Sequence, residues 1–527
     1  MQSNKPKYLW LNNFKSLNKK KYIRDLIRFL LIWYVFNLAI GVVKTLNEPP
    51  RGVHQGAQCD RASIALNYYE NGMNFLLPEV HETRCVDGIV SCEMPFTNYL
   101  AAVLYHLFGF DHFWFRVLTL TFLLIGLFFL HQLFCLFVKP IVSYFLIGII
   151  NSSPILLFYS NSFIPDTAAL GLIFVSWYLF FRAFVPHSFH KPLKLHWAYT
   201  LLFSLILGLA MAIKVTSAVQ WCTMLSVVLL SNFNFFKIDI INKKLAYKWL
   251  VFSTVLPILW RLWSNHLAST HNSQYFFQKI FIEPTWEKYA IDWGIYFYNW
   301  PRETFAIPLL CIVSSMLVLL VLFKSKINPV LWFISMINTL GFFMFLSIMI
   351  AQFKYHDYYI IALLPVVVLN WIAWANFFTN NAFIKWWMRI IIFAGIIWAF
   401  LFQFNYGYKQ LTDRYTVGTY WEQSQQNAED YLEFKNMLNK KGINRNQCVL
   451  VGYDGAPNNV LYLLNLRGYR ISKDHDKSSI RNFIKSSKPY YFISNDSAFL
   501  TKVKSIDSNF VLIEKYKNLE AYKFLSK

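Results

Sequence analysis

Charged side chains are scarce in this chain of 527 residues. They make up only 15% of it, whereas hydrophobic residues make up 56% and aromatic residues 19%. A soluble protein of that length needs far more polar surface to cover its core. Residues 122–137, 332–350 and 390–402 are apolar over lengths that approach the roughly 20 residues needed to cross about 30 Å of hydrocarbon. The composition therefore predicts a mainly α-helical polytopic membrane protein.

Acidic residues are also few, since 28 Asp and Glu stand against 50 Lys and Arg, which gives a formal net charge of +22. The basic residues are spread over many short loops and form no single stripe with interleaved aromatics, so we expect no nucleic-acid partner. Their excess falls instead in alternate loops between apolar segments, as the positive-inside rule requires. Membrane lipid is the predicted surrounding.

A cleavable signal peptide is missing, because the basic N-terminal residues lead into a first apolar stretch without a small-residue cleavage site. We expect residues 1–25 to be a basic cytoplasmic tail. About 11 transmembrane helices are predicted, near residues 26–46, 113–137, 140–158, 166–185, 197–214, 217–236, 247–264, 305–323, 328–350, 358–378 and 387–405. An odd number of crossings places the C-terminus on the extracytoplasmic, or periplasmic, side of the inner (plasma) membrane.

Three regions follow: the N-terminal tail, a transmembrane domain at 26–405, and a small extracytoplasmic α/β domain at 406–527. The last is predicted because the composition turns polar there and helical and strand patterns alternate. Two external segments are long, 47–112 and 265–304, and long loops usually carry function. In the first, residues 62–69 and 99–108 have helical apolar spacing but are too short to cross, so we expect interfacial helices.

Nucleotide-binding signatures are absent, since the sequence contains no Walker A loop, no Gly-x-Gly-x-x-Gly fingerprint and no zinc-helix motif. Asp474-His475-Asp476 matches the Asp-x-Asp pattern of transferases that use nucleotide sugars. A three-residue match in a hydrophilic turn is better explained as a solvated loop. Internal repeats, which many transporters show, are not evident either.

Acidic residues gather in the first external loop and the next short external turn: Asp60, Glu70, Glu79, Glu82, Asp87, Glu93 and Asp166. A carboxylate at the mouth of an apolar cavity has a raised proton affinity, which suits a general base for a hydroxyl nucleophile. Glu70, Glu79 and Glu82 are better read as ordinary solvated charges. Asp60 is the strongest candidate base.

Basic and aromatic groups near the same face are candidate ligands for a phosphate. Lys214 lies at the outer end of a hydrophobic hairpin, where an unpaired ammonium would be costly and a phosphate would offset the cost. Snorkelling to the interface is the alternative reading for a lysine there. The other candidates are Arg61, Lys354, His356 and Tyr358, among which Arg suits bidentate phosphate contacts.

Seven cysteines are an odd number, and three of them lie in apolar spans, where a small buried hydrophobe is the default. Cys85 and Cys92 are close enough in the sequence to close a small disulfide loop in an oxidising periplasm. The sequence alone does not give the pairing, and Cys59 would be left over.

One run resembles the first-loop signature of the bacterial GT-C glycosyltransferases, the group that includes the protein O-mannosyltransferases and the aminoarabinose transferase of lipid A. It reads His54-Gln55-Gly56-Ala57-Gln58-Cys59-Asp60-Arg61-Ala62-Ser63-Ile64-Ala65. The resemblance continues through Glu93-Met94-Pro95-Phe96, Pro165-Asp166-Thr167-Ala168, Lys214 and His356-Asp357-Tyr358-Tyr359. It covers the membrane part of the chain and not the C-terminal region.

In that family the acid that opens the first-loop helix is the proposed base, a second acid begins the fourth span, and basic or tyrosine groups hold the carrier phosphate. The resemblance places these roles on Asp60, Asp166, Lys214 and Tyr358. Arg61 stands where other members have a second acid. Glu93 joins Asp166 in positioning the acceptor, or in binding a divalent metal if one is used; no other cofactor is implied.

The residues and the resemblance agree on a membrane glycosyltransferase. It would move a hexosyl or pentosyl group from a polyprenyl-phosphate donor to a lipid, glycan or protein acceptor. The alternatives are a transporter or flippase of a lipid-linked glycan, and an oligosaccharide polymerase or ligase. Transporters tend to place ionisable residues at mid-membrane, whereas here the acids gather at one face.

Overall fold

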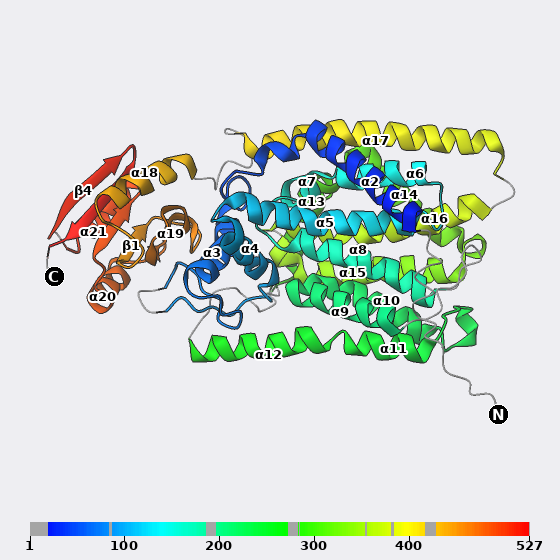
Figure 1. Ribbon diagram of the computed structural model, residues 1–527, viewed down its shortest axis with the longest axis horizontal. Coiled ribbons are helices and arrows are strands. Elements are labelled where there is room, and N and C mark those ends of the chain that lie inside the picture. Colours follow the sequence, from blue (N-terminus) through cyan, green and yellow to red (C-terminus); the bar gives the residue numbers. More distant parts are fainter. Residues whose placement is uncertain are drawn as a thin grey trace, which may run out of the picture. The chain divides into compact units, whose positions relative to one another are not determined.

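The computed structural model describes residues 19–83, 87–185, 197–271, 283, 285–353, 356–380, 384–416, 428–507 and 509–525 (Figure 1). It separates into two compact units, Met1–Thr45 and Leu46–Lys527. In the first unit the described elements are helix α2 (Lys19–Ile40) and the 3-10 helix η1 (Val42–Thr45). All further description concerns the second unit.

Helices make up the N-terminal three quarters of the second unit. They are α3 (Gln55–Glu70), α4 (Phe96–Phe108), α5 (His112–Phe134), α6 (Pro140–Asn151), α7 (Pro154–Tyr159), α8 (Asp166–Phe184), α9 (Trp197–Ile213), α10 (Ala218–Leu230), α11 (Lys243–Phe252), α12 (Val255–Thr270), α13 (Trp286–Thr304), α14 (Ile307–Leu322), α15 (Pro329–Phe353), α16 (Leu364–Asn380) and α17 (Trp386–Tyr415). Four 3-10 helices lie between them: η2 (Val215–Ser217), η3 (Asn234–Phe236), η4 (Lys324–Lys326) and η5 (Asp357–Leu363).

Six helical segments in the described part are long and apolar enough to cross a membrane, or seven if the bent pair α13–α14 is counted as one span. Shorter apolar helices, such as α6 and α9, account for other predicted spans. The chain is thus a mainly α-helical multi-pass membrane protein, as its composition predicts. The number of eleven crossings stays a prediction.

Residues 286–304 differ from the prediction, which placed them in an external loop. They form helix α13, which meets α14 at an angle of 104°. The bend falls at Phe305 and Ala306, both of which have extended backbone dihedrals. Helix α14 then begins with a proline in its first turn, where the missing N–H costs no hydrogen bond.

The C-terminal region forms the predicted small α/β domain. Its elements are α18 (Ala428–Lys440), β1 (Cys448–Gly452), α19 (Asn459–Leu464), β2 (Arg467–Ile471), α20 (Lys477–Ser487), β3 (Tyr491–Ser494), α21 (Ser497–Lys504), β4 (Phe510–Tyr516) and β5 (Leu519–Phe524). The strand order is β2-β1-β3-β5-β4. Strand β1 is parallel to β2 and β3, whereas β5 is antiparallel to β3 and β4.

Side chains of β1 divide between two apolar cores, because successive residues of a strand point to opposite faces. Val449 and Val451 pack in the core that includes α18 and α19. Leu450, between them, packs in the core that includes α20 and α21. The sheet is therefore covered on both faces, which fits the nearly continuous apolar sequence of β1.

The two predicted interfacial helices exist as α3 and α4, but α3 is enclosed by protein. Its residues 62–68 are all buried. Ala62 and Leu66 of α3 share one apolar core with Leu461 and Leu464 of α19, and Figure 1 shows α19 beside α3. The C-terminal domain thus covers the first-loop helix, which therefore does not lie open along a membrane surface.

Helix α8 packs closely against α5. A Cβ atom at Gly171 would lie 2.3 Å from the backbone oxygen of Phe122, and one at Gly126 would lie 2.3 Å from the Cα of Gly171. Small residues at such a contact let two helix backbones approach closely in the membrane. Asp166 is the first residue of the helix that this contact holds against α5.

Arg414, near the end of α17, is the centre of a buried ion network. Its Nη2 donates to Glu303 Oε2 at 2.6 Å and to Asp357 Oδ2 at 2.7 Å, and the side chains of Arg414 and Asp357 are fully buried. Asp357 also accepts from Tyr159 Oη at 2.6 Å and lies 3.0 Å from His54 Nε2. The network therefore joins α17, α13 and η5.

Replacing Arg414 by Leu should lower the free energy of unfolding by about 3–5 kcal/mol, because it leaves two buried carboxylates without their common cation. Denaturant titration of the purified protein in detergent measures the change. Arg302→Leu is the matched control, since Arg302 is exposed. Equal effects of the two substitutions would contradict a stabilising role for the network.

Candidate functional site

Four charged side chains from separate elements meet near the start of α8. Arg61 comes from α3, Glu93 from the segment before α4, Asp166 from the first turn of α8, and Lys214 from the junction of α9 and η2. We call Arg61, Glu93, Asp166 and Lys214 the ion cluster.

Lys214 lies between the two acids of the cluster. Its Nζ is 3.3 Å from Glu93 Oε1 and 3.3 Å from Asp166 Oδ2. Arg61 Nη2 donates to the other oxygen of Glu93 at 2.8 Å. Two cations and two carboxylates thus form one chain of contacts, and together they are formally neutral.

Local backbone contacts hold the cluster in place. Met94 N donates to Ala212 O at 3.0 Å, which ties the Glu93 segment to the end of α9 just before Lys214. Trp260 Nε1 donates to Cys92 O at 2.9 Å and so fixes the same segment from α12. Asp166 stands at the N-terminus of its helix, where the helix dipole favours a carboxylate.

Exposure differs within the cluster. The side chains of Lys214 and Asp166 are 5% and 4% exposed, whereas those of Arg61 and Glu93 are 13% and 24% exposed. Burial raises the pKa of Glu93, but the neighbouring Lys214 and Arg61 outweigh it, so the net pKa is lowered. Glu93 is therefore ionised at neutral pH, and the open side of the cluster lies at Arg61 and Glu93.

Aromatic rings from η5 and its N-terminal flank lie beside Lys214. Its Nζ is 5.3 Å from the ring centroid of Tyr358 and 5.0 Å from that of Tyr359. The rings of His356 and Tyr358 are 5.3 Å apart, and His54 lies 5.6 Å from His356. Cation–π contacts of this kind favour the charged lysine in a partly desolvated place.

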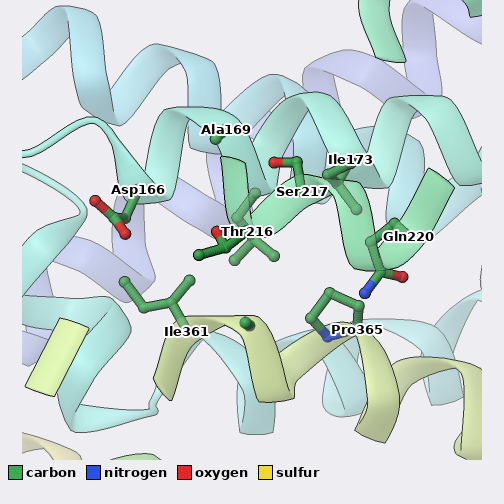
Figure 2. Close-up of a pocket in the computed structure, with 10 residues that line it drawn as sticks. Asp166, Ala169, Ile173, Thr216, Ser217, Gln220, Ile361 and Pro365 are labelled. Atoms are coloured by element: carbon green, nitrogen blue, oxygen red, sulfur yellow. The ribbon is translucent and has the colours of Figure 1, made fainter. Parts of the chain in front are cut away.

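A pocket extends from Asp166 between α8, the η2–α10 segment and the η5–α16 segment (Figure 2). Figure 2 shows Asp166 at one end and Gln220 at the other, with Ile173, Ile361 and Pro365 among the residues between them. Gln220 Oε1 is held by Trp177 Nε1 at 2.9 Å and Asn338 Nδ2 at 2.9 Å. The pocket is thus charged at one end and largely apolar along its walls.

Asp60 lies next to the ion cluster but faces the C-terminal domain. Its Oδ1 accepts a hydrogen bond from Asn458 Nδ2 at 2.8 Å. Burial raises the pKa of Asp60 to about 6, although the bond from Asn458 and the positive charges of Arg61 and Arg470 oppose the rise. A carboxylate with a pKa near 6 is ionised at neutral pH and is still a useful proton acceptor.

The structure thus brings together most of the residues singled out in the sequence. Arg61, Glu93, Lys214 and Asp166 form one chain of ion pairs in that order, and Tyr358 lies beside Lys214. The ring of His356 lies 5.3 Å from that of Tyr358, and Asp60 is next to Arg61 in the sequence. Lys354 lies outside the described residues.

A divalent metal is not needed to neutralise Glu93 and Asp166, because Lys214 already lies between them. Within the described ranges no three His, Cys, Asp or Glu side chains are grouped so that they could hold a metal ion. The chemistry of these donors therefore fits an ammonium, with a carboxylate on each side, better than a metal ion.

The acids read as solvated loop charges are in fact partners of arginines in the C-terminal domain. Glu70 pairs with Arg445, Glu79 with Arg467 at 3.2 Å, and Glu82 lies 4.0 Å from Arg470. The backbone joins in, because Thr83 N donates to Gly468 O at 2.9 Å and Gly468 N donates to His81 O at 3.1 Å. The acids therefore dock the domain onto the first loop. Sequence reasoning missed these partners, because they lie nearly 400 residues away.

The structure also bears on the predicted disulfide in the first loop and on the Asp-x-Asp match in the C-terminal domain. Cys92 is a free thiol, so its pairing with Cys85, which lies outside the described residues, is not formed. Asp476 of the Asp-x-Asp match caps helix α20 by accepting from Ser479 N at 2.8 Å. That role accounts for Asp476 without a nucleotide.

The Arg414 network was not anticipated from the sequence, although it lies directly behind the site. Asp357 belongs to a run that carries the resemblance, but no role was predicted for it or for Glu303 and Arg414. Asp357 sits between His356 and Tyr358, so its bond to Arg414 also holds these two residues. A buried arginine near the end of an apolar span is the signal that could have found it.

No family profile and no curated protein matches the chain. Solved structures do: ArnT from Cupriavidus metallidurans bound to undecaprenyl phosphate matches with a TM-score of 0.62 and 11% identity, over 97% of this chain and 99% of that one. The apo state of the same protein matches with a TM-score of 0.59 and 10% identity, over 96% and 98%. An oligosaccharyltransferase from Archaeoglobus fulgidus in the apo form has a TM-score of 0.49 and 10% identity, over 90% and 71%.

The ArnT matches extend over nearly the whole of both chains, so the transmembrane helices and the C-terminal domain follow one common arrangement. The likeness confirms the fold that the resemblance implies, since the chain shares the fold of ArnT. At this low identity the likeness establishes the fold and leaves the chemistry to the residues.

His81 gives the contact between loop and C-terminal domain a dependence on pH. It is fully buried, its Nδ1 lies 2.7 Å from Ser63 Oγ, and its Nε2 lies 3.0 Å from Asn465 Oδ1. Burial lowers the pKa of His81 to about 4. In the unfolded chain this histidine is protonated near pH 6.5. The contribution of the neutral, buried His81 to stability is therefore fully present above that pH and is lost as the pH falls toward 4.

His81→Gln should therefore make stability less sensitive to acid. Between pH 7 and pH 5 the unmodified protein should lose about 2 kcal/mol more than the variant, as measured by denaturant titration at both values. His271→Gln, at a half-buried histidine paired with Asp87, serves as the control. An unchanged pH slope in His81→Gln would show that His81 does not titrate in this range.

Proposed function

We propose that this chain is a membrane glycosyltransferase that moves a sugar from a polyprenyl-phosphate donor to a lipid, glycan or protein acceptor. The observation that carries the proposal is the ion cluster, whose Asp166 also lines one end of a largely apolar pocket. A donor with an anionic head and an isoprenoid chain has the same two parts. ArnT, whose fold the chain shares, has been solved bound to undecaprenyl phosphate.

The donor phosphate would approach from the open side, at Arg61 and Glu93, and meet the two cations. Arg61 presents a planar guanidinium that suits phosphate oxygens, and Lys214 presents a point charge. Part of their charge is already matched by Glu93 and Asp166, so both cations stay ionised when no donor is bound. Tyr358 lies over Lys214 and would orient the head group together with His356.

Transfer is a displacement at the anomeric carbon. The acceptor hydroxyl oxygen forms a bond to that carbon, the bond from the carbon to the phosphate oxygen breaks, and polyprenyl phosphate leaves with the electron pair. Asp60 takes the hydroxyl proton. Arg61 and Lys214 stabilise the negative charge that grows on the leaving phosphate, and this electrostatic effect is usually the largest single contribution.

Glu93 and Asp166 would act by holding the cations in place and by positioning the acceptor. Neither needs to change its protonation state, because each keeps a cation within 3.3 Å. Such preorganisation lowers the barrier, since the charges need no rearrangement when the bond breaks.

The proposal includes a topology. The ion cluster, Asp60 and the domain at 406–527 would lie on the extracytoplasmic side of the inner membrane, and the tail at 1–25 in the cytoplasm. The alternation of basic loops supports this arrangement. The transmembrane domain at 26–405 would then present its acids at one face; helix α17 itself continues beyond residue 405 to Tyr415.

Mass spectrometry of the lipid that copurifies with the protein tests the donor class. A polyprenyl phosphate, with or without a sugar, is the expected finding. Purified protein given that sugar-charged lipid and a mixture of envelope acceptors should then release polyprenyl phosphate. Binding of the lipid without any release in the complete mixture would argue for a transporter.

Asp60→Asn should reduce sugar transfer by roughly 100-fold to 10,000-fold and leave donor binding nearly unchanged. The amide is almost isosteric with the carboxylate but cannot accept the hydroxyl proton. Transfer and donor-lipid binding are measured separately on the purified variant. Asp87→Asn, in the same loop and paired with His271, is the control. Near-normal transfer by Asp60→Asn would move the role of base to Asp166.

Lys214→Met should weaken donor binding itself, because the ammonium meets the phosphate in the ground state as well as in the transition state. The apparent dissociation constant for the donor should rise, and the turnover rate should fall. Titration with undecaprenyl phosphate measures the binding. Lys248→Met, an exposed lysine on α11, should bind normally. Undiminished binding by Lys214→Met would remove Lys214 from the phosphate site.

A further inference from the structure

Asn458, just before helix α19, reaches across to the first-loop helix. Its Nδ2 donates to Asp60 Oδ1 at 2.8 Å, and its own Oδ1 accepts from Glu82 N at 2.8 Å. The residue is fully buried. The NH2 group of the amide meets an acceptor and its oxygen meets a donor, so the two partners fix the orientation of the amide.

The turn that carries Asn458 is itself rigid. Asp454 accepts from Ala456 N at 3.1 Å and from Val460 N at 2.8 Å, which closes the turn from β1 into α19. Asn458 O accepts from Tyr462 N at 2.8 Å. The turn also touches the first turn of α3, because a Cβ atom at Gly56 would lie 2.2 Å from that of Ala456.

Other ionisable groups surround Asp60 on all the elements packed against it. Arg61 and the thiol of Cys59 belong to its own helix, Arg470 to β2, and Asp454 to the turn after β1. Burial raises the pKa of Asp454 to about 7. Asp454 therefore titrates near Asp60, and an experiment on pH must separate the two.

We propose that Asn458 is a positioning residue for Asp60, so that the C-terminal domain forms part of the catalytic apparatus. The inference rests on the proposed function of Asp60 as the base. The amide occupies one oxygen of the carboxylate and holds its plane, which leaves the other oxygen to take the acceptor proton. It also keeps Asp60 ionised at lower pH than burial alone would allow.

The contact of Asn458 with Asp60 gives the C-terminal domain a part in the chemistry. All candidate catalytic groups precede residue 406 in the sequence, which favours a domain that only selects acceptors or adds stability. The hydrogen bond from Asn458 instead makes the state of the base depend on a residue of that domain. Loss of docking would then disturb the chemistry itself and not only the affinity for acceptor.

Asn458→Asp provides the main test. It exchanges the donating NH2 for a carboxylate oxygen next to Asp60, so the pKa of Asp60 should rise. Since the base must be ionised, the acidic limb of the transfer rate should move to higher pH, by roughly one unit or more. Asn458→Ala, which removes the donor without adding charge, should move it in the same direction by less.

Asn439→Asp is the control, because it makes the same exchange at an exposed position of the same domain. Its acidic limb should stay where it is in the unmodified enzyme. Asp454→Asn, measured in parallel, identifies any part of the limb that belongs to Asp454. The double variant Asp60→Asn with Asn458→Asp restores the hydrogen-bonded pair with its partners exchanged, so it should regain stability but not transfer.

Infrared difference spectra give a readout that does not require transfer. The carboxyl band that is missing in Asp60→Asn should titrate at higher pH in Asn458→Asp. If the unmodified enzyme transfers sugar and Asp60→Asn does not, while both Asn458 variants keep the acidic limb and the band unmoved, the inference about Asn458 is wrong and the proposed function stands. If the unmodified enzyme transfers nothing but the band still shifts, the contact is real and the proposed function fails.

Discussion

The side chain of Lys214, which ends in an ammonium, is only 5% exposed and lies at the junction of two apolar helices. Burying such a charge costs several kcal/mol unless it is paired and hydrogen-bonded. The fold meets this requirement by bringing Glu93 from one segment and Asp166 from another to within 3.3 Å. The start of α8, the end of α9 and the segment before α4 must therefore meet at one point. The pocket begins beside Asp166, so the same constraint that stabilises the lysine also fixes one end of the pocket.

Two layers of charged contacts surround this point. In the first layer, Arg414 binds Asp357, and this bond also holds the neighbouring residues His356 and Tyr358. In the second layer, arginines of the C-terminal domain pair with acids of the first loop and bring Asn458 to Asp60. Both layers join elements that are far apart in the sequence. The site is thus held by ion pairs and hydrogen bonds that depend on the correct docking of the C-terminal domain and of α17.

Much of the fold could be predicted from the sequence. Long apolar segments fix α5, α8 and α15, because a helix is the structure that satisfies its own backbone in a membrane. The polar composition after residue 405, together with alternating helical and strand patterns, identified the C-terminal domain and its strand β1. Helix α13 was missed, since its charged and aromatic residues do not form a continuous apolar run and it resembles a polar loop. The burial of α3 was missed too, because its apolar face fits a membrane surface as well as it fits α19.

The candidate residues of the site stand out in the sequence alone: a lysine in an apolar hairpin, an acid at the start of a span and an acid-arginine pair in the first loop are each unusual enough to be noticed. Only the tertiary structure decided how they are arranged. It placed Lys214 between Glu93 and Asp166, turned Asp60 toward Asn458, and converted the acids at 70, 79 and 82 from solvated charges into docking partners. The physical reason is that burial and pairing depend on contacts between distant segments. The type of a charged residue indicates the free energy that its burial would cost, but which group pairs with it depends on the tertiary fold.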